Sequence, residues 1–226
     1  MALKTPRAEK FRQEVVYVHG PGAFPYMTMF ATAGFQMTDD INNATIVCFT
    51  GGEDVNPALY GEPNRIIQNR GVSRFSTQRD DRDAYVFGLN CANKVLQIGI
   101  CRGGQFLNVM NGGRMWQHVN GHVTPHNLVD AITGEVVKVT STHHQMMRPS
   151  AEGEVIASAR EASFKYAEPD EWHIEQDAEI NPGLLEDVEV VWYEESKCLC
   201  FQPHPEFADA VECREYFLSL IERIIH

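Results

Sequence analysis

The chain has 226 residues, of which 43% are apolar, and a formal net charge of −12. This length suits one α/β domain, here expected to span residues 1–226, and the apolar share is enough for a full core. The negative charge argues against binding a phosphate backbone, so no nucleic-acid partner is expected. No apolar run approaches the length of a membrane span, and the polar start lacks the apolar centre of a signal peptide. A cytoplasmic protein without membrane association is therefore expected.

Strand-like and helix-like segments alternate along the first half of the chain. The expected strands are 14–18, 45–49 and 95–100, and the expected helices are 26–33, 80–93 and one that opens after Cys101 and ends at 112–113. This alternation predicts a mostly parallel central sheet with helices on both faces. β-rich runs at 135–140, 154–158, 188–193 and 198–202 predict a smaller β-rich portion, and 210–225 predicts a closing amphipathic helix. Residues 1–13 are expected to form a loosely ordered segment.

Cys101 follows an apolar strand and opens a helix within the sequence GICRGGQ (99–105). A strand-turn-helix corner turns its side chain outward, and small neighbours allow the backbone to bend that sharply. The helix N-terminus favours a thiolate, and the next backbone N–H faces a developing oxyanion. This stretch alone is equally compatible with a buried structural cysteine. The other cysteines form no CxxC pair and are expected to be reduced, mostly as core residues: Cys48, Cys91, Cys198, Cys200 and Cys213.

His204 follows the last expected strand, within the sequence QPHPE (202–206). The flanking prolines stiffen the backbone and keep it out of a helix or a sheet ladder. Glu206 stands two residues on, close enough in an extended segment to bond the imidazole and fix its tautomer. Sites in parallel sheets lie outside the carboxyl ends of the strands, where Cys101 is also expected. The sequence therefore favours a set of Cys101, His204 and Glu206 over an isolated surface histidine.

Together, GICRGGQ and QPHPE resemble the two motifs of class I glutamine amidotransferases, in the same order and about a hundred residues apart. The resemblance covers most of the chain and implies a flavodoxin-like fold. It implies that Cys101 is the nucleophile, His204 the general base and acid, and Glu206 the orienting carboxylate. Pro203 departs from the aromatic or aliphatic residue usual before the histidine. This departure alters local packing without removing a catalytic group.

The loop after the second strand begins with two glycines in the sequence TGGEDVNPALYGE (50–62). Its amides can approach a ligand closely, although a plain tight turn fits the glycines equally well. The loop resembles the γ-glutamyl hydrolase branch of the family (peptidase family C26), as do Arg102 after the nucleophile and the Arg-Asp pair at 79–80. By this resemblance, Gly52, with Gly51 beside it, and Arg102 supply the backbone N–H groups of an oxyanion hole.

Substrate-binding residues are also implied by the resemblance. Gln105, one turn after the nucleophile, matches the family's glutamine-binding glutamine. The sequence STHHQ (141–145) resembles a stretch that lines the glutamine pocket, which implies His143, His144 and Gln145 as substrate-binding residues. The two histidines also compete with His204 as the base. We prefer His204, because Glu206 accompanies it and no carboxylate lies near His143 in the sequence.

Other features suggest chemistry that we do not expect. His118, His122 and His126 are spaced like ligands on one helix face, but the Asn-Gly at 120–121 and the proline at 125 interrupt such a helix, so no metal is expected. The Cys-x-Cys at 198–200 is expected to pack in the core. The Gly-Pro-Gly at 20–22 lacks the ending of a phosphate loop. The arginines and aspartates of 65–83 are expected to form a solvated, salt-bridged loop and helix start.

The expected activity is hydrolysis of the γ-amide of glutamine or of a γ-glutamyl compound, a small-molecule substrate. The triad would form a γ-glutamyl thioester and release glutamate with ammonia or an amine, without any metal or organic cofactor. In one hypothesis the ammonia passes to a separate synthetase. In another the protein is a self-sufficient hydrolase of γ-glutamyl peptides or polyamine conjugates. A non-catalytic binding module is the third alternative, against which the intact Cys, His and Glu set argues.

Overall fold

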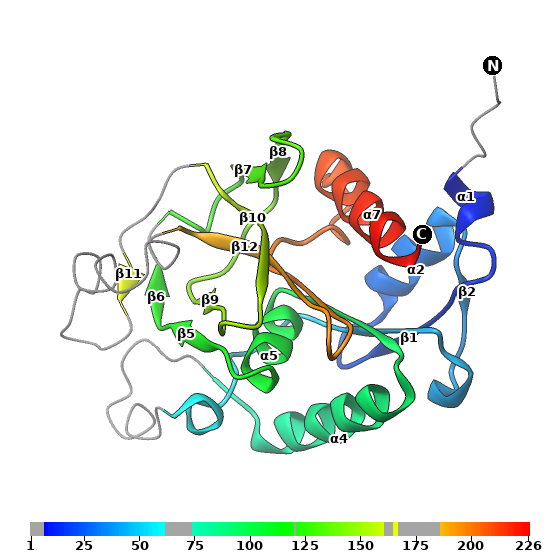
Figure 1. Cartoon of the computed structure of the whole chain (residues 1–226), viewed down its shortest axis with the longest axis horizontal. Helices are drawn as coiled ribbons and strands as arrows, with labels where there is room; N and C mark the ends of the chain where they lie inside the picture. Colours follow the sequence, from blue (N-terminus) through cyan, green and yellow to red (C-terminus); the bar gives the residue numbers. More distant parts are fainter. Residues whose placement is uncertain (1–6, 62–73, 120, 161–164, 167–185) are drawn as a thin grey trace.

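The computed structural model describes residues 7–61, 74–119, 121–160, 165–166 and 186–226 (Figure 1). The helices are α1 (Arg7–Lys10), α2 (Phe24–Ala33), α4 (Thr77–Asn93), α5 (Arg102–Met110) and α7 (Val211–Ile225), with short 3₁₀ turns η1 (Ile41–Asn43) and η2 (Pro57–Tyr60). Within these residues, every helix is too short or too polar to cross a bilayer.

Nine of the described strands form one sheet in the order β2-β1-β3-β4-β13-β12-β10-β7-β8. They are β1 (Val15–His19), β2 (Gln36–Met37), β3 (Ile46–Phe49), β4 (Leu96–Ile100), β7 (His126–Asp130), β8 (Val136–Val139), β10 (Glu154–Ala159), β12 (Val188–Tyr193) and β13 (Cys198–Phe201). Two small sheets pair β5 (Arg114–Trp116) with β9 (Met146–Arg148), and β6 (His118–Val119) with β11 (Lys165–Tyr166).

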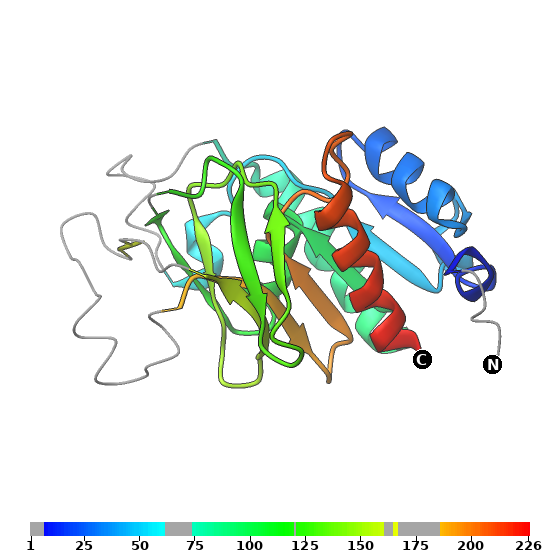
Figure 2. The ribbon, with the colours of Figure 1, turned by 90° about the horizontal axis from the view of Figure 1, so that it is seen from above.

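The sheet is parallel from β2 to β13 and antiparallel from β13 to β8. The parallel half is the part whose strands alternate with helices in the sequence, because a parallel pair needs a crossover connection. The predicted α/β, flavodoxin-like fold is confirmed. Its β-rich portion is largely a continuation of the central sheet. In the view from above, α7 lies between α2 and the antiparallel strands (Figure 2).

Helices cover both faces of the parallel half, and the side chains of β3 show why. Ile46 and Cys48 point into a core shared with Phe30 of α2 and Phe217 of α7. Val47 and Phe49 alternate with them and pack in a second core with α4 and α5. A strand that is apolar at every position is therefore buried on both sides, as expected of a central parallel strand. Figure 1 shows α2 and α7 on one side of the sheet and α4 and α5 on the other.

The beginning of the described chain is more ordered than expected. Residues 7–10 form α1, and Phe11 is fully buried. Its ring stacks on Phe35, with centroids 4.2 Å apart. The expectation of a loose segment therefore fails from Arg7 onward, because one aromatic side chain anchors the segment to the core. Residues 1–6 lie outside the described part.

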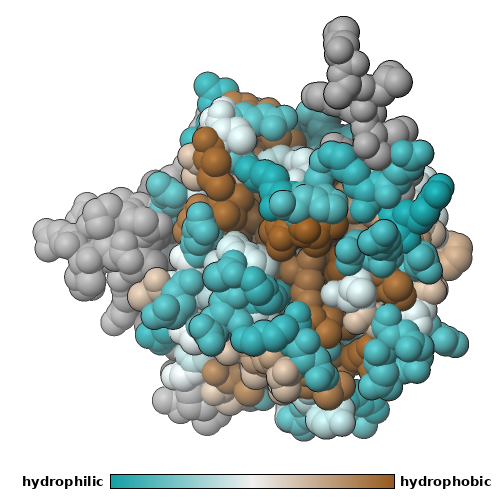
Figure 3. Space-filling view, turned by 45° about the vertical axis from the view of Figure 1, so that its right-hand side comes forward, coloured by the Kyte–Doolittle hydropathy of each residue, from teal (hydrophilic) through white to brown (hydrophobic). Residues whose placement is uncertain are grey.

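An apolar groove lies at the amino end of β4. It is lined by apolar side chains from several elements, with charged residues at its border: Leu96, Ile156, Trp192, Leu199, Leu220 and Ile224. Figure 3 shows an apolar furrow between hydrophilic side chains on the face that it presents. Because Leu96 and Cys101 are five strand residues apart, the groove is about 16 Å from the predicted nucleophile. It is therefore separate from the site described next.

Candidate active site

Four neighbouring parallel strands bring the predicted site residues to one edge of the sheet. The order β1-β3-β4-β13 aligns His19 with Phe49, Phe49 with Gly99, and Ile100 with Phe201. The chain leaves β3 into the glycine loop, β4 into Cys101 and β13 into the segment that carries His204. Segments more than 150 residues apart in the sequence, such as 50–52 and 204–206, therefore leave the same edge of the sheet.

Cys101 occupies a sharp corner between β4 and α5. Its backbone has φ +52° and ψ −115°, a conformation that costs a non-glycine residue energy. The glycines around it are required by close packing. A Cβ on Gly103 would lie 2.2 Å from the Phe49 carbonyl oxygen, and one on Gly99 would lie 2.3 Å from the backbone of Gly103. The corner therefore has the strained geometry of a nucleophile elbow.

His204 lies beside Cys101. Nδ1 of its ring is 2.7 Å from Oε1 of Glu206. A Cβ built on Gly51 would lie 3.3 Å from Cε1 of His204 and 3.4 Å from Cβ of Cys101, so Gly51 sits between the two side chains. The Phe207 ring stacks on the imidazole, with centroids 4.5 Å apart and an angle of 6°. Nδ1 is occupied by Glu206, which leaves Nε2 as the nitrogen that can act on the sulfur.

The charge state of His204 follows from its neighbours. Burial lowers its pKa, but the Cys101 side chain and Glu206 outweigh burial and raise the pKa to about 10. A raised pKa means that protonated His204 stabilises the fold fully below its ordinary value of 6.5, and that this stabilisation is lost as pH rises through about 10. At pH 7 the imidazole is therefore cationic and can give up a proton.

We therefore expect the His204 ring to keep its proton until about pH 10, as followed by NMR titration of its ring signals. In Glu206→Gln the midpoint should fall, because a neutral amide does not favour the imidazolium. A His204 midpoint near 6.5 in the unaltered protein would contradict this description.

The glycine loop holds its two glycines in different ways. The Gly51 N–H donates to the Tyr26 hydroxyl at 3.0 Å, so this amide already has a partner. Gly52 has φ +138°, and a Cβ there would lie 2.5 Å from Nη1 of Arg79. Only glycine therefore fits at position 52. Burial, with Glu206 in addition, raises the pKa of Tyr26, which keeps its hydroxyl protonated. Of the two loop amides, Gly52 is the better oxyanion candidate.

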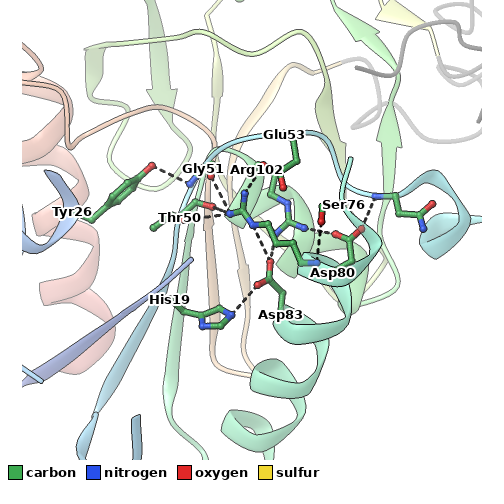
Figure 4. A network of polar contacts seen from close by, with 11 residues as sticks. His19, Tyr26, Thr50, Gly51, Glu53, Ser76, Asp80, Asp83 and Arg102 are labelled. Carbon is green, nitrogen blue, oxygen red and sulfur yellow. Dashed lines mark hydrogen bonds and ion pairs between the residues drawn. The ribbon is translucent and has the colours of Figure 1, made fainter. Parts of the chain in front are cut away.

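A buried charged network supports both the loop and the elbow (Figure 4). Arg79 of α4 donates through Nη2 to the carbonyl oxygens of Thr50 at 2.8 Å and Gly51 at 3.0 Å, and through Nη1 to Glu53 at 3.0 Å. These bonds fix the loop that precedes Gly52. Burial and the neighbouring Arg102 lower the pKa of Arg79, while Asp83 and Glu53 oppose that effect.

Arg102 turns its guanidinium away from the sulfur and into this network. It is 1% exposed and forms ion pairs with Asp80 and Asp83. Asp83 also accepts from Nε2 of His19 at 2.8 Å. Burial raises the pKa of Asp83, but His19 and Arg102 outweigh it and lower that pKa overall. The side chain of Arg102 is therefore engaged in this network, and the role of its backbone N–H in an oxyanion hole stays a prediction.

The expectation of a solvated arginine-aspartate stretch is wrong for its centre. Arg79, Asp80 and Asp83 are buried, whereas Arg74 and Arg82 are exposed. The arginines at 65 and 70 lie outside the described residues. The i, i+3 and i+4 spacing of these residues on α4 turns one face of the helix toward Arg102. That face is buried because the glycine loop and the elbow pack on it.

Gln105 lies in α5, one turn after Cys101, and is buried. Its Nε2 donates to the Gln145 carbonyl at 3.2 Å and to Oε1 of Gln202 at 3.2 Å. The Gln145 side chain donates in turn to Gln117 at 3.0 Å. The structure thus brings two of the predicted substrate-binding residues together, and Gln202, which precedes the His204 motif, joins them. The glutamine amides connect α5, the segment 141–145 and the end of β13.

His143 and His144 point in different directions, and each has a carboxylate nearby. Nε2 of His144 is 3.1 Å from Asp54, and Nε2 of His143 is 3.7 Å from Glu189. His204 was preferred from the sequence because no carboxylate lies near His143. In the structure Glu189 does lie near His143, so that reason is wrong. The better reason is that His204 is the histidine that the Cys101 side chain acts on electrostatically.

Sequence reasoning missed several residues of the site. Tyr26, Thr140 and His19 belong to no motif, and Glu53 lies in the glycine-loop motif but was given no role there. Thr140 Oγ1 donates to the His204 carbonyl at 2.7 Å and so holds the backbone of that residue. Arg79 stood in a recognised Arg-Asp pair, which was a usable signal. The six cysteines are all free, and the expected core packing of Cys198 and Cys200 is confirmed.

The peptidase C26 family model matches residues 7–206. A relative from Mycobacterium tuberculosis, provisionally named a glutamine amidotransferase, is 32% identical over 134 residues, which are 48% of this chain and 40% of the relative. A glutamine amidotransferase-like protein of Lactococcus lactis, also provisionally named, is 38% identical over 33% of this chain and 30% of its own. The chain thus spans less than half the length of these curated relatives.

Two solved structures share the fold. A glutamine amidotransferase from Thermotoga maritima has a TM-score of 0.57 at 9% identity, covering 93% of this chain and 83% of that one. A protein from Thermoplasma acidophilum, provisionally identified as one subunit of a GMP synthase, has a TM-score of 0.61 at 13% identity, covering 94% of each chain. At these identities the likeness shows the fold alone.

Proposed function

Because this chain belongs to the peptidase C26 family, within the class I glutamine amidotransferases, we propose that it hydrolyses the γ-amide of glutamine or of a γ-glutamyl compound. The observation that carries the proposal is the pairing of a strained Cys101 at the elbow with a His204–Glu206 pair beside it. A strained backbone at a cysteine is retained where the side chain must be presented for reaction.

In the proposed first half-reaction, the Cys101 sulfur forms a bond to the γ-carbonyl carbon, and the carbonyl electrons move onto oxygen. The backbone N–H groups of Gly52 and Arg102 hold this oxyanion. As the oxyanion collapses, the C–N bond breaks and protonated His204 gives its proton to the leaving ammonia or amine. The product on the enzyme is a γ-glutamyl thioester.

In the second half-reaction, water attacks the thioester and passes a proton to His204. The C–S bond then breaks, glutamate leaves and the thiolate returns. The hydrogen bond to Glu206 keeps a proton on Nδ1 of His204, so that Nε2 faces the reacting atoms in both steps. Phe207 covers one face of the imidazole and limits its contact with solvent water. The two-step route splits one difficult displacement into two easier ones.

The test is release of glutamate by the purified chain from glutamine and from γ-glutamyl amides of small peptides and polyamines. We expect glutamate from at least one of these substrates. Fast turnover of a conjugate by the chain alone would favour a self-sufficient hydrolase. Activity on glutamine that appears only with an added synthetase would favour an amidotransferase subunit, a role for which the GMP synthase protein described above is a precedent of the same fold. No release from any substrate, with or without a synthetase, would favour the non-catalytic binding module.

A further inference from the structure

Three histidines and one glutamate form a second cluster. His122 lies in the turn before β7, His126 in β7, His143 in the segment before β9, and Glu189 in β12. The rings of His122 and His126 have centroids 4.5 Å apart, and those of His122 and His143 have centroids 4.8 Å apart. One donor atom from each of His122, His126 and Glu189 lies within 4.8 Å of the others. His118, His122 and His126 share no helix, as expected from the sequence. The fold nevertheless brings His122 and His126 together.

The donor atoms are spaced as a metal site requires. Oε1 of Glu189 lies 3.0 Å from Nδ1 of His122, 3.1 Å from Nε2 of His126 and 3.7 Å from Nε2 of His143. A tetrahedral zinc ion with bonds of about 2.0–2.2 Å separates adjacent ligand atoms by about 3.3–3.6 Å. The observed distances bracket that range. Small side-chain movements would therefore bring the three histidine nitrogens to the distance from Oε1 of Glu189 that a tetrahedral ion requires.

The opposite nitrogen of each imidazole faces a hydrogen-bond acceptor. These acceptors are Asp187 Oδ2 at 2.8 Å for His122, the Thr124 carbonyl at 3.3 Å for His126 and the Gln145 carbonyl at 2.9 Å for His143. An N–H that donates outward allows the inward nitrogen to carry the lone pair that binds a metal ion. The three acceptors therefore form the outer shell that would orient the histidine ligands of a metal ion. Burial lowers the pKa of His122, but Asp187 and Glu189 outweigh burial and raise it to about 9, so binding an ion there displaces a proton.

Several inward atoms are buried without a hydrogen bond to the described residues. They are Nδ1 of His122, Nε2 of His143 and Oε2 of Glu189. Nδ1 of His122 lies 3.0 Å from Oε1 of Glu189, with which it forms an ion pair when the ring is protonated. The Glu189 side chain is 0% exposed; its Oε1 accepts from Nε2 of His126 at 3.1 Å, whereas its Oε2 has no hydrogen bond to the described residues. Buried polar atoms without partners cost free energy, which an ion at the centre would offset.

We propose that His122, His126, His143 and Glu189 bind one divalent transition-metal ion. Nitrogen and carboxylate donors in a four-coordinate arrangement point to Zn²⁺. Four protein ligands leave no open position for a substrate, so the ion has a structural role. It holds residue 143 against β12, and therefore positions the Gln145 carbonyl that Gln105 contacts. This inference does not rest on the proposed hydrolysis.

The experiment measures zinc binding by the full chain in the Cys101→Ala background, which removes the reactive sulfur as a competing ligand. The protein is stripped with a chelator and titrated with Zn²⁺ alone, and bound metal is counted by elemental analysis. We expect one zinc per chain and a higher Tm. Co²⁺ in place of zinc should give the intense visible absorption of a four-coordinate nitrogen-oxygen site.

Variants identify the ligands. His126→Asn and Glu189→Gln should each weaken zinc binding on the order of 100-fold or more, because removing a ligand costs more than altering the outer shell. His144→Asn is the matched control, since its ring bonds Asp54 outside the cluster, and it should keep one zinc. Equal affinity in all three variants, or no zinc bound by the parent at micromolar free metal, would overturn the proposal. Should a variant fail to fold, the parent's cobalt spectrum and stoichiometry decide.

Discussion

Cys101→Ala is expected to lower kcat for glutamate release on the order of 10⁴-fold or more. Alanine keeps the backbone of the elbow and the side chains of His204 and Glu206 but removes the only atom that can form the thioester. The residual rate would come from the oxyanion hole and from substrate binding. Steady-state kinetics on the best γ-glutamyl substrate give the measurement.

A second cysteine supplies the control for this prediction. Cys91 lies on α4, is partly buried and accepts from Gln97 at 3.3 Å, well outside the site. Cys91→Ala should leave kcat within about twofold of the unaltered protein. The thioester mechanism is refuted if Cys101→Ala keeps full activity. Equal loss in both variants would instead point to general destabilisation, which their Tm values would reveal.

Arg102→Met is expected to lower the free energy of unfolding by about 3–5 kcal/mol. The guanidinium is almost fully buried between Asp80 and Asp83, and methionine fills similar space without the charge. Removing one partner leaves two buried carboxylates facing each other. Arg79 (3.6 Å from Asp83) and His19 compensate only part of that cost. Urea denaturation at pH 7 measures the effect.

The control for the stability measurement lies on the same helix. Arg82 is exposed on α4, so Arg82→Met should change the free energy of unfolding by less than about 0.5 kcal/mol. A loss below about 1 kcal/mol in Arg102→Met would mean that the two aspartates are not held as buried charges. Because Arg79 also pairs with Asp83, a large loss would also loosen the loop that carries Gly52.

The elements of the parallel half follow from the sequence because each is encoded locally. Apolar residues at every position of 46–49 predict a buried central strand, and the structure has β3 there. Glycines around Cys101 predict a corner, because no other residue allows the approach of α5 to β3 and β4. The strands β5, β7 and β9 were not predicted, and neither were the shorter strands β2, β6 and β11. The two residues of each of β2, β6 and β11 are too few to show a period of two.

Charged residues were harder to interpret from the sequence. Asp80 and Asp83 were predicted to lie in a solvated helix start, because charged side chains usually face water. They are buried only because Arg102, nineteen or more positions later, lies against them. The histidines at 122, 126 and 143 were assigned no common site, because the carboxylate that joins them stands at 189, on a strand after a long intervening segment.

What the sequence alone determined is therefore the part of the site whose residues are neighbours in the chain. The elbow at Cys101 and the His204–Glu206 pair each lie within one short motif, so spacing and local backbone chemistry identify them. Only the tertiary structure decided which distant groups contact one another: Tyr26 contacts Gly51, Arg79 contacts the glycine loop, and Glu189 lies among three histidines. These contacts depend on strand order and register, which bring together residues tens of positions apart, and no local pattern in the sequence encodes them.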